Sequence, residues 1–489
     1  MKKLSTFLAL ALLIGAVSIA PSFAKQNRQV ARRPPNIVFI LADDLGYGDL
    51  GSYGQKKIRT PYLDKMASEG MRFTQFYSGS PVCAPSRAVL MTGKHGGHAF
   101  IRDNKEVQPE GQWPIPAGEV TIAELLKAQG YATGGFGKWG LGFIGSEGDP
   151  NKQGFDLFYG YNCQREAHNF YPDHLWRNDQ KVVLEGNSRG LTGKHYSHDL
   201  IEAEALKFIR DNRDKPFFAY VPFTIPHLAL QVPEDSLKEY AGKWDDPPYD
   251  GKNGYLPHQT PRAAYAAMVT RMDRSVGRIF SLLKELNLDD NTLVIFSSDN
   301  GGAFGEVTKD FDFQPGRMGG TDYVFFNSTG NSRAFKGSIY EGGIRVPFIA
   351  RWPGKIKAGS VNPLPAVFYD LMPTFCEVAG ATTPKESDGL SILPTLLGKA
   401  QKKHEFLYWD FGGYGGQQAV RAGDWKALRR NLHRGNLRTE LYNLAQDPGE
   451  EHDLADKHPE IVKRLEKIMA EQHQPSATFP IKVLDQAAK

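Results

Sequence analysis

Short apolar runs that end at glycine, aspartate or asparagine recur along this chain, and they constrain its fold more than any other feature. Asn36–Ala42 (NIVFILA) and Thr292–Ser298 (TLVIFSS) are continuous and rich in β-branched or aromatic residues. Such runs are typical of strands in a parallel sheet covered on both faces. Similar runs occupy residues 216–223 and 346–351, and helical patterns occupy 121–129, 199–210 and 265–286. This alternation predicts an α/β fold with a large, mostly parallel or mixed sheet sandwiched by helices.

The pattern changes after about residue 385. Short runs in residues 405–444 are separated by Gly, Asp and Asn, which predicts a small antiparallel sheet, and residues 458–472 predict a closing helix. We therefore expect a main domain over 35–384 and a C-terminal subdomain over 385–489, preceded by a linker at 25–34.

The first 24 residues have the pattern of a secretory signal peptide. Lys2 and Lys3 precede an uncharged apolar stretch, and Ser22-Phe23-Ala24 ends in small residues. The alternative is an uncleaved membrane anchor, although the stretch is short for a span. No later stretch reaches spanning length, so we expect a soluble mature protein in a bacterial periplasm or outside the cell.

Charge and cysteine content narrow the possible functions. The net charge is +4, and losing the two lysines of the leader lowers it to +2. This near-neutral balance argues against a general nucleic-acid binder. The odd cysteine count (Cys83, Cys163 and Cys376) leaves either a free thiol or one cysteine with a special role. Cys163 and Cys376 either pair or are two buried free thiols.

Two predicted strands end in paired oxygen ligands. Asp43-Asp44 follows the first run and Asp299-Asn300 follows the run at 292–298. Ligands of open α/β sheets bind beyond the carboxyl ends of the strands. Carboxylate and amide oxygens suit Ca²⁺ or Mg²⁺ rather than zinc. The alternative is ordinary turn chemistry, since Asp and Asn favour turns and caps.

A loop cysteine lies beside a predicted helix start in the segment Pro81–Gly93. A thiol near a helix N-terminus and an arginine tends to be acidic and reactive, although a buried structural cysteine is the alternative. Cys83-Ala84-Pro85-Ser86-Arg87 matches the C-x-P-S-R signature of the type I sulfatases, and Met91-Thr92-Gly93 matches the element that follows it. The chain thus resembles this formylglycine-dependent, arylsulfatase-like family of the alkaline phosphatase superfamily.

The resemblance covers nearly the whole chain after the leader, and its motifs occur in the order usual for the family. They include Pro35–Asp44, Arg59–Asp64, Gly137-Lys138-Trp139, Pro226-His227, Ser298–Gly301, Lys336-Gly337, Glu341–Pro347, Leu441–Leu444 and Asp447–Glu450. It implies an alkaline-phosphatase-like fold in which residues 35–384 form the catalytic domain.

The resemblance also implies a mechanism. A maturation enzyme oxidises Cys83 to formylglycine (3-oxoalanine), whose aldehyde hydrates to a diol. One hydroxyl attacks sulfur and displaces the alcohol, and deprotonation of the other expels sulfate. The implied metal is Ca²⁺, with Mg²⁺ less favoured, held by Asp43, Asp44, Asp299, Asn300 and the modified residue 83.

The remaining catalytic roles follow from the same resemblance. Arg87 and Lys138 would hold the diol and neutralise charge. His227 and Lys336 would contact the sulfate and its bridging oxygen, and either would serve as general acid. Without the family, a satisfied loop histidine is the better explanation of His227, and a solvated surface cation that of Lys336.

One position departs from the family pattern Gly-Lys-Trp-His-Leu-Gly. Gly140 stands where the histidine often assigned as the base for sulfate expulsion is expected. We therefore predict that another histidine takes this role, with His168 as the first candidate and His95 and His98 as alternatives.

Residues 163–177 (CQREAHNFYPDHLWR) have the composition of a sugar pocket, with aromatic faces and polar donors. A solvated loop is the alternative. The segment resembles bacterial sulfatases that act on sulfated galactose or N-acetylgalactosamine. The glycine-rich loop 412–417 is a candidate cover for the pocket. The candidate sugar contacts are Arg165, His168, His174, Trp176 and Arg177.

Three other functions stay open at this point. The first is a formylglycine-dependent phosphodiesterase or phosphonate monoester hydrolase, because sulfate and phosphate esters share their geometry. The second is a non-catalytic binder of sulfated glycans with an unmodified Cys83. The third is a hydrolase that uses the Cys83 thiolate directly.

Overall fold

The computed structural model describes residue 1, residues 33–303 and residues 318–487. From Pro34 onward the chain forms one compact unit. The predicted signal peptide (residues 1–24) and nearly all of the predicted linker lie outside the described residues. Within the described ranges, no helix has the length and apolar character needed to cross a membrane.

The main sheet has parallel strands at its centre and antiparallel strands toward its edges. Its order is β12-β2-β11-β10-β1-β9-β5-β6-β7-β8, with β13 paired to β2. The five central strands from β10 to β6 are parallel, whereas β11 and β7 run against their inner neighbours. The strands are β1 (Asn36–Ala42), β2 (Met71–Tyr77), β5 (Ala132–Lys138), β6 (Leu157–Tyr161), β7 (His174–Arg177), β8 (Gln180–Val183), β9 (Phe217–Pro222), β10 (Thr292–Ser298), β11 (Arg345–Arg351), β12 (Ser360–Asn362) and β13 (Ala366–Val367).

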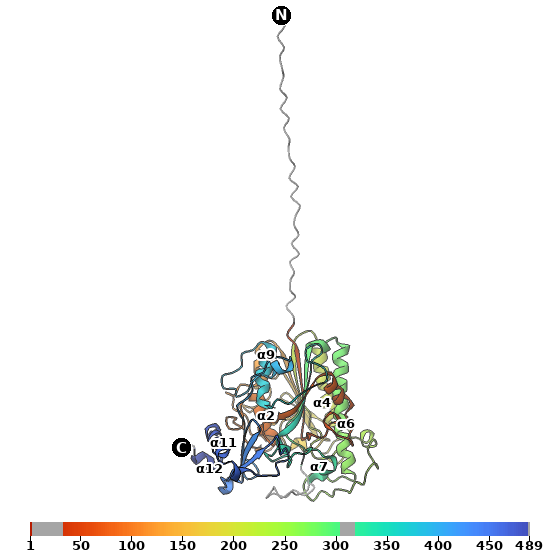
Figure 1. Ribbon diagram of the computed structural model, residues 1–489. Helices are drawn as coiled ribbons and strands as arrows, with labels where there is room; N and C mark the ends of the chain where they lie inside the picture. Colours follow the sequence, from red (N-terminus) through yellow and green to blue (C-terminus); the bar gives the residue numbers. More distant parts are fainter. Residues whose placement is uncertain (2–32, 304–317, 488–489) are drawn as a thin grey trace. The chain divides into compact units, whose positions relative to one another are not determined.

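Helices cover both faces of this sheet, as Figure 1 shows for α2 and α9 on one side and α4 and α6 on the other. Alternate residues of β1 explain the two layers. Ile37, Phe39 and Leu41 belong to one apolar core, and Val38 and Ile40 belong to the other. The first core contains residues of α2, α3 and α9, and the second those of α1, α4 and α6. The helices of this domain are α1 (Pro61–Glu69), α2 (Cys83–Thr92), α3 (Ile122–Ala128), α4 (Ser197–Asp211), α5 (Glu234–Leu237), α6 (Pro261–Glu285), α7 (Tyr323–Phe326), α8 (Glu341–Ile344) and α9 (Leu371–Ala379).

The structure confirms the α/β fold predicted from the apolar runs. Every strand and helix predicted above is present, with ends that differ by four residues at most. One central strand, β5, escaped the sequence pattern because it contains three glycines in ATGGFGK. A Cβ atom at Gly137 would lie 1.9 Å from the carbonyl oxygen of Pro222 on the neighbouring strand β9. The glycine therefore allows the two strands to pack closely at this position.

The C-terminal region forms the predicted antiparallel sheet. Its strand order is β14-β15-β16-β17. Trp409 and Leu428 join the core of the main sheet, while Tyr408 and Val420 pack against α11 residues such as Leu465. The elements are α10 (Leu393–Leu396), β14 (Leu407–Phe411), β15 (Gln417–Ala422), β16 (Trp425–Arg430), β17 (Glu440–Asn443), α11 (Pro459–Gln472) and α12 (Lys482–Ala487). A small hairpin, β3 (Glu106–Val107) and β4 (Gly111–Gln112), completes the strands.

Candidate active site

The carboxyl ends of β1 and β10 bring four polar side chains together. The two strands pair in parallel with Ala42 beside Ser298, so the residues that follow emerge at one edge of the sheet. The backbone amide of Asp44 donates to Asp299 Oδ1 (3.2 Å), and Asn300 Nδ2 donates to Asp44 Oδ1 (2.8 Å). Asp43 completes the group, and all four side chains are fully buried. The register of two apolar strands therefore assembles a hydrophilic site.

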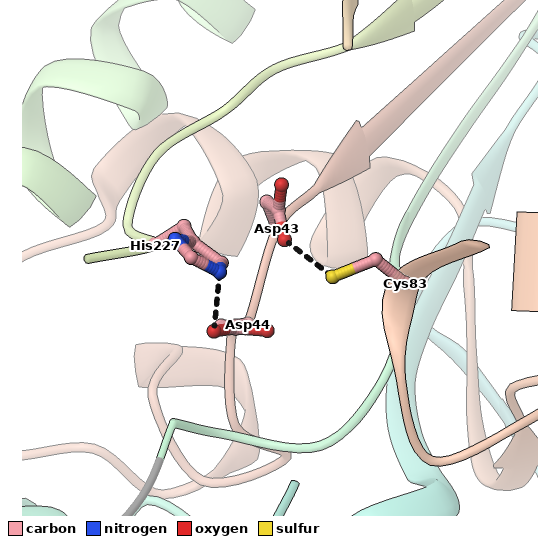
Figure 2. A group of neighbouring side chains, drawn as sticks. All are labelled: Asp43, Asp44, Cys83 and His227. Atoms are coloured by element: carbon pink, nitrogen blue, oxygen red, sulfur yellow. Dashed lines mark hydrogen bonds and ion pairs between the residues drawn. The ribbon is translucent and has the colours of Figure 1, made fainter. Parts of the chain in front are cut away.

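Cys83 is the first residue of α2 and points into this group. Its Sγ lies 3.5 Å from Asp43 Oδ1, and the residue is 2% exposed. Figure 2 shows the two side chains facing each other. Burial, reinforced by Asp43, raises the pKa of the thiol to about 12. The sequence left two alternatives, an acidic reactive thiol or a buried cysteine. The structure favours the buried one, because burial and a carboxylate outweigh the nearby lysines. Direct thiolate chemistry at neutral pH is therefore disfavoured.

Arg87 and Lys138 neutralise two of the carboxylates. Arg87 donates through Nε and Nη2 to Asp299 Oδ2 (3.1 and 2.8 Å), and Lys138 Nζ lies 2.6 Å from Asp43 Oδ2. Burial alone would raise the pKa of Asp43, but Lys138, followed by His227 and Arg87, holds it well below its ordinary value. The pKa of Asp299 is raised to about 6, because burial and Asp43 outweigh Arg87. Both cations thus hold carboxylates that would otherwise repel one another.

His227 and Lys336 form a contact pair on the other side of the group. Lys336 Nζ lies 2.8 Å from Asp44 Oδ2 and 3.0 Å from His227 Nε2. Since an ammonium group only donates, His227 Nε2 accepts this bond, and Nδ1 donates to the carbonyl oxygen of Leu228 (2.5 Å). Burial, followed by Lys336, lowers the pKa of His227 well below its ordinary value. The imidazole is therefore neutral beside a protonated lysine.

These side chains fit a hard divalent cation. The Asn300 Oδ1 atom is buried and has no hydrogen-bond partner among the residues that the structure describes. Ligand atoms of Asp43, Asp44, Cys83 and His227 lie within 4.8 Å of one another. Three carboxylates balance three basic side chains here, so a divalent cation would leave a positive site that favours an anionic substrate. We call these residues the polar cluster: Asp43, Asp44, Cys83, Arg87, Lys138, His227, Asp299, Asn300 and Lys336.

His168 lies against the polar cluster. Its ring stacks on that of His227, with centroids 4.7 Å apart and an interplanar angle of 8°. Burial, followed by His227, lowers the pKa of His168 well below its ordinary value. Its neutral ring is thus within reach of the site as a proton acceptor, and its role as the base stays a prediction.

The other two histidine candidates for the base have different surroundings. His95 and His98 follow the C-terminal end of α2, a helix about 15 Å long whose first residue is Cys83. Asp388 contacts both, with His98 Nδ1 at 2.9 Å, and His95 Nε2 lies 3.1 Å from Gln472 Oε1. The structure thus ties these two histidines to the C-terminal region.

Gln164 fills the space beside Gly140. A Cβ atom at Gly140 would lie 2.3 Å from Gln164 Nε2, and the glycine has a φ of +78°. The amide side chain of Gln164, a residue in the loop after β6, therefore lies where a side chain at position 140 would begin. A side chain at position 140 would meet both a clash and an unfavourable backbone conformation.

His174 and Trp176, on β7, share a carboxylate with each other. His174 Nε2 lies 2.9 Å from Glu110 Oε2, its Nδ1 lies 2.6 Å from Asp173 Oδ1, and Trp176 Nε1 donates to Glu110 Oε1 (2.5 Å). Burial opposes protonation, but Glu110 and Asp173 raise the pKa of His174 above its ordinary value. Both side chains are thus held by acidic partners outside the polar cluster.

The two arginines of residues 163–177 are also paired. Arg165 Nε lies 3.7 Å from Glu106 Oε2, with both side chains more than 40% exposed. Arg177 Nη1 donates to Glu204 Oε2 (2.5 Å). Of the five candidate sugar contacts, only His168 touches a residue of the polar cluster in the contacts described here.

Two tyrosines near the polar cluster were not predicted. The Tyr255 ring centroid lies 5.2 Å from that of His168, and the Tyr414 ring packs on Gly337, the residue after Lys336. The glycine-rich loop 412–417 pointed to the region of Tyr414, but no sequence signal pointed to Tyr255. Both come from irregular loops, which carry no periodic pattern.

The other two cysteines do not pair. Cys163 and Cys376 are buried free thiols, so the structure favours the simpler of the two alternatives left open by the sequence. Burial raises the pKa of Cys163 to about 11.

Comparisons with known proteins identify the family of this chain. The model of the family described as "Sulfatase" matches residues 35–381, and that described as "N-sulphoglucosamine sulphohydrolase, C-terminal" matches residues 331–475. Human N-acetylgalactosamine-6-sulfatase is 32% identical over 487 residues, covering 91% of this chain and 86% of the relative. Human arylsulfatase A is 33% identical over 487 residues, covering 89% and 87%.

A solved structure shows the same likeness in three dimensions. The crystal structure of Ps i-CgsB in complex with k-i-k-neocarrahexaose has a TM-score of 0.74 and 29% sequence identity. The match covers 90% of this chain and 94% of that one.

Proposed function

Because this chain belongs to the type I sulfatase family of the alkaline phosphatase superfamily, we propose that it is an exported, Ca²⁺-dependent sulfatase that works through a formylglycine made from Cys83. Membership of this family makes the protein a sulfuric ester hydrolase. The substrate we propose is a sulfated carbohydrate of the galactose or N-acetylgalactosamine type.

The observation that carries the proposal is the polar cluster built around residue 83. A thiol with a pKa near 12 is a poor nucleophile at neutral pH. Its surroundings are nevertheless those of a reactive group, with Asp43 at 3.5 Å and Lys336 Nζ at 3.6 Å from Sγ. Oxidation to formylglycine would put a hydrated aldehyde oxygen in this place, which resolves the contradiction.

The chain's own side chains then have definite roles. Asp43, Asp44, Asp299, Asn300 and the modified residue 83 would hold Ca²⁺, which would supply positive charge beside the sulfate oxygens. Lys336, protonated and 3.0 Å from His227, would donate to the bridging oxygen of the ester, and His227 would orient it. Arg87 and Lys138 would keep the carboxylates ionised around residue 83.

The proposal assigns removal of the second proton at residue 83 to His168. It is neutral, and it stacks on His227. Gly140 cannot take this role, and Gln164 occupies the space beside it. A glutamine amide is not a base at neutral pH, so a histidine remains the chemically suitable group.

Relatives support a carbohydrate substrate. The human relative described above is named for N-acetylgalactosamine 6-sulfate, and the solved neighbour holds a neocarrahexaose. We extend a sulfated sugar of this class to the present chain. We also propose that residues 1–24 are removed on export to the periplasm or medium and that a maturation enzyme modifies Cys83. The proposed boundary between the catalytic domain and the C-terminal subdomain lies after residue 384.

Two measurements on protein purified from its native source test the proposal. The mass of the peptide spanning residue 83 should show loss of the thiol and gain of an aldehyde. Sulfate release from galactose 6-sulfate and N-acetylgalactosamine 6-sulfate should require Ca²⁺ and exceed the hydrolysis of matched phosphate and phosphonate esters. An unmodified cysteine, or faster turnover of the phosphorus esters, would contradict it.

A further inference from the structure

Tyr255 approaches the polar cluster from the loop that precedes α6. Its ring centroid lies 5.2 Å from that of His168, at 63°, and 6.0 Å from that of His227, at 70°. Its φ is +65°, which is uncommon for a bulky side chain. The surroundings therefore hold this tyrosine edge-on to the two stacked histidines.

Tyr414 approaches the polar cluster from the loop between β14 and β15. Its φ is +47°, and its ring lies so close to Gly337 that a Cβ atom there would be 3.3 Å from the ring. The ring of Phe411 supports it at 5.9 Å. Tyr414 is nevertheless 40% exposed, so it is partly accessible to solvent.

The rings of Tyr255 and Tyr414 both lie near the contact between Lys336 and His227. Tyr255 lies beside His227, Tyr414 lies on the residue after Lys336, and Lys336 Nζ is 3.0 Å from His227 Nε2. Burial raises the pKa of both tyrosine hydroxyls, and the same neighbours, Lys336, Asp44 and Cys83, act on both. Non-glycine residues in left-handed conformations cluster at ligand clamps, where function maintains the strain.

We propose that Tyr255 and Tyr414 form an aromatic clamp for the pyranose ring that carries the scissile sulfate. The clamp rests on the proposed function, because it assumes a sugar ester rather than an aryl ester. Aromatic rings bind sugars through the C–H faces of the pyranose. Galactose-type sugars suit such a clamp because their axial 4-hydroxyl leaves one face rich in C–H groups.

The clamp is tested by substituting each tyrosine in enzyme that carries the modified residue 83. With N-acetylgalactosamine 6-sulfate and galactose 6-sulfate, Tyr255→Ala and Tyr414→Ala should each raise KM about 3- to 10-fold, the range of a single aromatic contact. Their kcat should change much less. The Ki of inorganic sulfate, which occupies the sulfate position without a sugar, should stay within about 2-fold.

Three controls separate the clamp from a structural role. Tyr255→Phe and Tyr414→Phe keep the rings and should preserve KM, whereas Tyr62→Ala removes a tyrosine of α1 that is 42% exposed and should change nothing. An unchanged KM in both alanine variants, or a parallel rise of KM and sulfate Ki, would overturn the clamp alone. A wild-type enzyme that releases no sulfate from either sugar would overturn the proposed function before any variant is made.

Discussion

The polar cluster and residues 163–177 are both rich in charge, but they use it in opposite ways. In the cluster, carboxylates and basic groups share partners, as where Lys138 and Arg87 both approach Asp43 (2.6 and 3.3 Å). In residues 163–177, each arginine has one acidic partner: Arg165 pairs with Glu106 at the surface, and Arg177 pairs with the half-buried Glu204. The polar cluster is buried and, with a bound cation, would attract an anion. The charges of the two arginines in residues 163–177 are already neutralised by their acidic partners.

This difference predicts that the two regions respond differently to substitution. Exposed one-to-one ion pairs are worth only about 0–1 kcal/mol and gain little from a ligand. Buried groups with shared partners are sensitive to every change of charge. We therefore expect substitutions in the polar cluster to affect catalysis far more than those in residues 163–177, with His168 as the exception.

The largest effect should come from Cys83→Ala. Removing a nucleophile or its precursor should lower kcat for sulfate release by at least about 10⁴-fold. The unfolding midpoint should change little, since a small buried side chain is replaced by another. Residual activity near that of the wild type would show that residue 83 is not the nucleophile and would remove the contrast between the two regions.

The next effect should come from Lys336→Met, which removes a positive charge 2.8 Å from Asp44. We expect kcat to fall about 10²- to 10³-fold, the cost of losing one charged donor in a buried site. Lys357→Met, at an exposed lysine, is the matched control and should retain full activity. Equal effects of the two substitutions would contradict the assigned role of Lys336.

His168→Ala tests the candidate sugar contact whose ring stacks on His227 of the polar cluster. Sulfate release should slow about 10²-fold or more, as expected for loss of a general base, while release of the alcohol in a single turnover persists. His452→Ala, 77% exposed, serves as the control. Near-normal sulfate expulsion would exclude His168 as the base.

The smallest effect concerns His174 and stability rather than catalysis. Its pKa is raised in the folded state, so its contribution to stability is full below its ordinary pKa and is lost as pH rises through the folded value. The difference in the free energy of unfolding between wild type and His174→Gln should therefore shrink from about pH 5.5 to pH 9. Denaturant unfolding across this range measures it, and a difference that grows with pH would contradict the assignment.

The sequence predicted the polar cluster better than its surroundings. Asp43 and Asp299 follow strands whose apolar runs are visible without a structure, and the carboxyl ends of parallel strands meet at one edge. Tyr255 and Gln164 could not be found in this way, because their positions depend on loop conformation. The sequence left the acidity of Cys83 open for a related reason, since its helix position was visible in the sequence and its burial beside Asp43 was not.

The burial of residue 83 limits when an enzyme can modify it. Asp43 and Asp299 are 256 positions apart and meet only after β1 has paired with β10, which is a slow, non-local event. Once that pairing has formed and α2 has packed on the sheet, a side chain that is 2% exposed offers almost no surface to a second enzyme. Any enzymatic oxidation of Cys83 must therefore precede the completion of folding. Chains that fold unmodified would stay inactive, so the active fraction would be set by a race between modification and folding.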